Sequence, residues 1–110
     1  MDADITSARR TLLDERERLR AELSEAIEAP GAMTYGSQAA AASQVFEQQR
    51  DLALRDRTRL QLGLVEAALG RIDDGTFGTC QRCGKPIAAE RLEALPWAAY
   101  CIACQREVGR

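Results

Sequence analysis

Four cysteines are the residues in this 110-residue chain whose type and spacing point most directly to chemistry. They form two C-x-x-C pairs, Cys80 with Cys83 and Cys101 with Cys104. A C-x-x-C turn directs two sulfurs toward one point, and two such turns supply the four tetrahedral thiolates of a structural zinc site. Because the chain has no histidine, such a site is all-sulfur. We therefore expect one structural Zn²⁺ held by these four cysteines.

Other uses of paired cysteines fit the sequence less well. Disulfides suit small secreted domains, but no apolar signal segment follows the charged N-terminus, which favours a reducing cytoplasm. Thiol redox chemistry belongs to a C-x-x-C among alternating strands and helices, which neither pair has around it. Four thiolates also close the zinc shell, and histidine, the commonest general base, is absent. We expect no enzymatic activity.

The charge pattern limits the partners. The formal net charge is -2, and residues 75–110 carry five basic against three acidic side chains. Four zinc-bound thiolates bring this C-terminal part close to neutral, so it lacks the clustered basic face that grips a nucleic-acid backbone. No segment approaches the roughly 20 apolar residues that span a bilayer. We expect a cytoplasmic protein without direct nucleic-acid or membrane contacts, and the sequence leaves its oligomeric state open.

The residues before the cysteines predict two helices that would position the zinc module. Apolar residues at spacings of three, four and seven predict amphipathic helices over about 5–28 and 38–73, and Pro30-Gly31 breaks the chain between them. The first stripe is Ile5, Leu12, Leu19, Leu23 and Ile27, and the second is Leu54, Thr58, Leu62, Val65, Leu69 and Ile72.

So long a second helix must bury its apolar stripe. We expect a mainly α fold in which residues 1–74 form an antiparallel coiled-coil hairpin, with its tip at about 30–37, and residues 75–110 form the C4 zinc finger. Dimerisation through the stripe is the alternative.

Within the finger, the segment 87–95 predicts one short helix or turn that ends before Pro96. We expect a small apolar cluster around the metal, with Trp97 either in that cluster or exposed as an anchor for a partner. The cluster would contain Phe77, Ile87, Leu92, Leu95, Trp97 and Tyr100.

The finger motifs resemble those of one bacterial family. The similarity is densest in Gly75-Thr76-Phe77-Gly78-Thr79-Cys80, in Cys83-Gly84-Lys85-Pro86-Ile87, in Arg91-Leu92-Glu93-Ala94-Leu95-Pro96 and in Cys101-Ile102-Ala103-Cys104. Together with the expected hairpin, they make the chain similar to the DksA/TraR family of zinc-finger transcription regulators over roughly residues 37–105. The resemblance implies a regulator that binds RNA polymerase directly through its secondary channel and modulates initiation without DNA contacts.

The tip departs from the family pattern. Where family members carry a D-x-x-D-x-A tip, this sequence has Ser37, Ala40 and Ala42, and no acidic residue occurs from 30 to 44. Met33 and Tyr35 offer apolar contacts there instead, or the loop is simply built from small residues. The candidate partner-binding tip is therefore Met33, Tyr35, Ser37, Ala40 and Ala42. The missing carboxylates also leave a second hypothesis, a zinc-ribbon coiled-coil adaptor that binds another protein.

Overall fold

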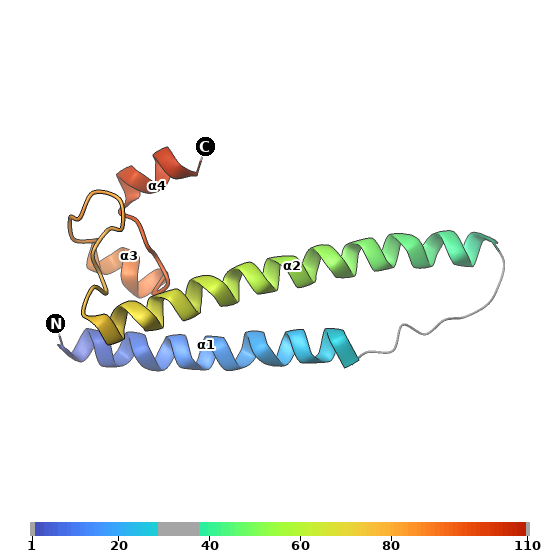
Figure 1. The fold of residues 1–110 in the computed structure, drawn as a ribbon, viewed down its shortest axis with the longest axis horizontal. Helices are drawn as coiled ribbons and strands as arrows, with labels where there is room; N and C mark the ends of the chain where they lie inside the picture. Colours follow the sequence, from blue (N-terminus) through green and yellow to red (C-terminus); the bar gives the residue numbers. More distant parts are fainter. Residues whose placement is uncertain (1, 29–37, 110) are drawn as a thin grey trace.

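Two long antiparallel helices dominate the computed structural model, which describes residues 2–28 and 38–109 (Figure 1). Helix α1 spans Asp2–Glu28 and helix α2 spans Gln38–Asp74. Two short helices follow, α3 at Ala89–Ala94 and α4 at Ile102–Val108. Side chains are described for 5–25 and 44–109. Of the predicted tip residues, Met33, Tyr35 and Ser37 lie outside the described part, while Ala40 and Ala42 lie in the first turns of α2.

The hairpin is held together by one narrow apolar seam. Its buried residues are Leu12 and Leu19 from α1 with Val65, Ala68 and Ile72 from α2. These positions recur at intervals of three, four or seven, so each helix presents one stripe to the other. The structure thus confirms the predicted intramolecular pairing of α1 and α2. The core lies near the end of the hairpin that carries the finger.

Ion pairs across the seam fix the antiparallel register. Arg9 Nη2 lies 3.4 Å from Asp73 Oδ1, and Arg20 Nη2 lies 3.0 Å from Glu66 Oε2. The residue numbers increase along α1 while those of the partners in α2 decrease, as antiparallel helices require. These side chains are largely exposed, so the pairs specify alignment more than they add stability.

Helix α2 continues well beyond the end of α1 (Figure 1). With Arg20 opposite Glu66, α1 runs out at Glu28, and about 20 residues of α2, or about 30 Å, extend past it. We call residues 38–57 the α2 extension.

The sequence explains why the buried stripe stops there. The positions that continue it toward the start of α2 are Asp51, Glu47 and Gln44, all polar. Leu54, expected on the buried stripe, is accordingly 52% exposed. The expectation that Leu54 packs in the seam was wrong because no described part of α1 reaches it.

The chain leaves α2 through a tight turn into the finger. The backbone N–H groups of Thr76 and Phe77 both donate to the carbonyl oxygen of Arg71, at 2.9 and 3.1 Å. Gly75 takes a φ of +83°, a left-handed conformation that glycine adopts at little cost. Helix α2 ends at Asp74, one residue after the predicted end at 73 and within the predicted exit Asp73-Asp74-Gly75.

The finger divides its apolar residues between two clusters, whereas one cluster around the metal was expected. Phe77 and Trp97 pack against the hairpin seam, while Leu92 and Tyr100 pack around the buried Ile87 and the cysteines. Trp97 is therefore neither part of the metal cluster nor a fully exposed anchor, because it joins the finger to the hairpin.

The predicted fold class is confirmed as mainly helical with a C-terminal four-cysteine module. An isolated bridge between Thr79 and Pro86 is the only β-type pairing in the described residues. Across 2–28 and 38–109, none of the helices combines the length and the apolar character needed to cross a membrane.

Candidate metal centre

The first cysteine pair lies in a tight loop whose two arms pair with each other. Cys80 N–H donates to the Lys85 carbonyl at 2.8 Å, and Ile87 N–H donates to the Gly78 carbonyl at 2.8 Å. Between them, Gly84 N–H donates to the Cys80 carbonyl at 3.0 Å, and Gly84 takes a φ of +76°. A side chain at Gly84 would strain this turn. The loop therefore holds the Cys80 and Cys83 side chains on the same side.

The second pair lies at the start of α4. Cys101 is the N-cap residue, with extended backbone angles (φ -68°, ψ 166°), and Cys104 lies in the first turn. A residue at the N-cap and one three positions later face the same direction, so the helix start aims both sulfurs at one point. The sequence pattern did not predict α4, although this helix orients the second pair.

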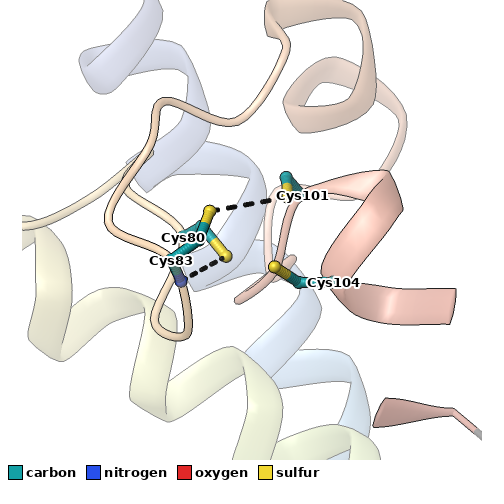
Figure 2. A group of neighbouring side chains, drawn as sticks. All are labelled: Cys80, Cys83, Cys101 and Cys104. Carbon is teal, nitrogen blue, oxygen red and sulfur yellow. Dashed lines mark hydrogen bonds between the residues drawn. The ribbon is translucent and has the colours of Figure 1, made fainter. Parts of the chain in front are cut away.

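The four sulfurs converge between the loop and α4 (Figure 2). All four lie within 4.8 Å of one another, and Cys83 Sγ lies 3.8 Å from Cys101 Sγ. Four thiolates around one zinc ion at about 2.3 Å lie about 3.8 Å apart in a tetrahedron. No disulfide joins them. The arrangement therefore fits a structural zinc ion, as the sequence predicted, and four sulfurs leave no coordination position for a reacting water.

The thiols differ in how readily they become thiolates. Burial by itself would raise the pKa of Cys80, but the backbone N–H groups of Cys83, Cys101 and Arg82 outweigh it and lower the pKa to about 6. The backbone N–H of Cys104 lowers the pKa of Cys101. Burial raises the pKa of Cys104 to about 12. Cys80 and Cys101 are therefore prepared to bind a cation, whereas Cys104 must give up a proton to do so.

Two arginines connect the centre to its surroundings, and the sequence pattern predicted a role for neither. Arg91 Nε donates to the Tyr100 carbonyl at 3.1 Å, next to the ligand candidate Cys101. Arg71 Nη2 lies 3.4 Å from both the Trp97 and the Ala98 carbonyls. No spacing rule predicts such contacts, since the acceptors are backbone atoms far along the chain.

Comparison with known proteins now identifies the module. Residues 75–108 match the family of the prokaryotic dksA/traR C4-type zinc finger. Over its C4 module, this chain is therefore similar to the dksA/traR zinc-finger family. The resemblance seen in the sequence is thereby confirmed, and the four clustered cysteines agree with the C4 type of this finger.

Curated relatives of the dksA/traR finger match this chain beyond the module. The RNA polymerase-binding transcription factor DksA of Caulobacter vibrioides (strain NA1000 / CB15N) is 38% identical over 64 residues, 58% of this chain and 45% of that protein. Its counterpart in Escherichia coli (strain K12) is 41% identical over 64 residues, 58% of this chain and 42% of that protein. The matches thus span less than half the length of these curated relatives.

A solved structure resembles nearly the whole chain. Transcription factor DksA2 from Pseudomonas aeruginosa has a TM-score of 0.84 and 28% sequence identity, and the match covers 97% of this chain and 84% of that one. The dksA/traR finger of this chain is therefore combined with a hairpin in the same overall arrangement as in DksA2.

Proposed function

We propose that this chain is a bacterial transcription regulator that binds RNA polymerase directly, through the secondary channel, and modulates initiation without contacting DNA. The observation that carries the proposal is the similarity to transcription factor DksA2 over 97% of the chain, which includes both hairpin and finger. Curated relatives that match 64 residues of this chain are named RNA polymerase-binding transcription factors. A binding role rather than catalysis follows from a metal site that four sulfurs close.

The two parts of the chain would divide this task. Residues 1–74 form the hairpin, which reaches the partner, and residues 75–110 form the finger, which braces the base of the hairpin. The molecule measures 59 × 30 × 20 Å, so it is long and narrow enough to enter a channel. Among the described residues, the α2 extension continues past the end of α1 at the far part of the hairpin (Figure 1).

The metal in this proposal is structural. Cys80, Cys83, Cys101 and Cys104 would hold one zinc ion, which supplies folding free energy to a finger whose apolar cluster is small. The near-neutral charge of the zinc-loaded finger supports a protein partner over a nucleic-acid one. The chain would work in the cytoplasm, where RNA polymerase is found.

Site-specific photo-crosslinking tests the proposal. A photoreactive residue at Ala40 or Ala42, at the start of α2, should crosslink to polymerase subunits that line the secondary channel when the zinc-loaded chain is mixed with RNA polymerase. An excess of unlabelled chain should abolish the product, and the same label at Val108, at the far end of the finger, should give no channel crosslink. Absence of any association with polymerase, in pull-down as well as crosslinking, would reject the function.

One observation favours a second candidate function. The segment 30–44 has no acidic residue, so it cannot make charge-assisted contacts like those of the carboxylate-bearing tip that the family pattern implies. A coiled-coil adaptor for a different protein would retain the hairpin and the finger without that tip. Crosslinks from Ala40 and Ala42 to a protein other than polymerase in living cells, with no polymerase product, would select this alternative.

A further inference from the structure

Arg71 contacts two segments where the hairpin and the finger meet, one that leaves α2 and one that follows α3. Its carbonyl oxygen accepts the N–H groups of Thr76 and Phe77, where the chain leaves α2. Its guanidinium donates to the Trp97 and Ala98 carbonyls, where the chain returns from α3, at 3.4 Å each. We call Arg71, Phe77, Trp97 and Ala98 the joint.

The charge of Arg71 is not neutralised within the joint. Among the described residues no carboxylate forms an ion pair with it, although the side chain is half-buried. Burial lowers the pKa of Arg71, and the charge of Asp74 offsets part of that effect. A partly desolvated cation held by two long contacts to neutral carbonyls adds little stability. The two contacts do, however, restrict direction, because both use one nitrogen, Nη2, whose two N–H groups are fixed in the guanidinium plane.

The joint is also connected to the metal centre through the segment 97–101. The Ala99 carbonyl accepts Gln81 N–H at 2.8 Å, within the first cysteine loop. The Tyr100 carbonyl accepts Arg91 Nε at 3.1 Å, and the next residue is Cys101. The same five residues therefore run from the acceptors of Arg71 to a sulfur of the metal centre. If the metal is lost, Cys101 is released and the acceptors lose their fixed position.

We propose that Arg71 is a positioning residue that sets the direction of the zinc finger relative to the hairpin, and that it does so only while the metal holds the segment 97–101 in place. The apolar contacts of Phe77 and Trp97 keep the two parts together, but a thin apolar contact permits rotation. The two guanidinium contacts remove that freedom. This inference concerns the isolated protein and does not depend on the proposed function.

Residual dipolar couplings measured on the full zinc-loaded chain test the proposal. In the native protein, couplings from α2 and from the finger should fit a single alignment tensor. In Arg71→Met they should require two tensors, while native mass spectrometry still finds zinc bound. Arg71→Lys retains the charge, but the N–H groups of its ammonium rotate on a flexible stem and have no fixed plane, so it should resemble Arg71→Met. Arg20→Met, which removes the pair with Glu66 within the hairpin, is the matched control and should retain a single tensor.

A single shared tensor in zinc-bound Arg71→Met would overturn the proposal. Trp97, the only tryptophan, gives a second readout that needs no mutation. Removing zinc from the native chain with a chelator should raise the acrylamide quenching of its fluorescence about twofold, because the side chain leaves the seam. Unchanged quenching after complete metal removal would show that the joint does not depend on the metal, and would also overturn the proposal.

Discussion

Each cysteine of the metal centre has its own surroundings, although the sequence treats all four alike. Cys80 and Cys104 are both buried, yet the pKa of one is lowered to about 6 and that of the other is raised to about 12. The difference arises because backbone N–H groups surround Cys80, whereas burial dominates at Cys104. Spacing alone predicted the ligand set, because zinc requires only that four sulfurs meet. Spacing carries no information about the local donors.

The lowered pKa of Cys80 belongs to the folded finger, because the backbone N–H groups that cause it surround the sulfur only there. Since the finger should unfold without metal, zinc has to displace the protons of four ordinary thiols. Each thiol should then contribute up to about a tenfold loss of zinc affinity per unit of falling pH, with no break near pH 6. Competition with a chromophoric chelator of known pH dependence, from pH 8 to 5, measures this. A change of slope near pH 6 would mean that Cys80 keeps its folded surroundings without metal, and would contradict the prediction.

Arg71 shows what residue patterns leave out. Its side-chain acceptors are carbonyls 26 and 27 positions later, and every residue type offers a carbonyl. The contact therefore depends on how the finger folds back, which a one-dimensional pattern does not encode. The packing of Phe77 and Trp97 against the hairpin seam was not predicted for the same reason. An aromatic side chain fits an apolar cluster around the metal as well as it fits the seam.

At the scale of elements, the helices follow closely from their sequences. Periodic leucines, the Pro30-Gly31 break and the Asp73-Asp74-Gly75 exit predict α1 and α2, and the structure has them at Asp2–Glu28 and Gln38–Asp74. The point where the two stop pairing was less evident, because periodicity in one helix does not show how far its partner extends. Helix α4 was not predicted at all, since seven residues are too few to show a clear period.

The seam should respond strongly to truncation of a buried leucine. Leu12 is fully buried, so Leu12→Ala should lower the free energy of unfolding by about 2–4 kcal/mol through lost burial and a cavity. Leu60, 73% exposed on α2, is the matched control, and Leu60→Ala should change it by less than about 0.5 kcal/mol. Urea unfolding followed by circular dichroism measures both. Equal effects of the two substitutions would mean that the seam does not hold the hairpin together.

Two glycines of α2 and its exit should respond in opposite ways to alanine. Gly70 lies within α2, and a Cβ there meets nothing within 4 Å, so Gly70→Ala should stabilise the protein by about 0.5–1 kcal/mol. Gly75 has a φ of +83°, so Gly75→Ala should destabilise it by about 1 kcal/mol. Thermal unfolding midpoints, compared at equal zinc loading, measure both effects: the midpoint should rise for Gly70→Ala and fall for Gly75→Ala. A rise in the midpoint for Gly75→Ala would contradict the turn geometry.

At the scale of the whole molecule, the hairpin and the finger rely on different sources of stability. The hairpin has an apolar seam of its own, whereas the finger has the small cluster around Ile87 and the metal centre. Since such a cluster is too small to fold by itself, metal binding should supply most of the folding free energy of the finger.

Removal of zinc should therefore unfold one part and spare the other. Helices α3 and α4 have 6 and 7 residues against 27 and 37 in α1 and α2, so chelation should cost roughly a sixth of the helical circular dichroism signal. Cys104→Ser should produce the same spectrum without a chelator. A loss of most helicity in either experiment would show that the hairpin does not fold independently of the metal.

Because α2 is longer than α1 and meets the finger at only one end, a small rotation at that end moves the other end a long way. Over a helix of about 55 Å, a tilt of about 10° at the pivot displaces the opposite end by about 10 Å. Angular precision at one half-buried arginine would thus decide whether the remote end meets its target or misses it by the width of a helix.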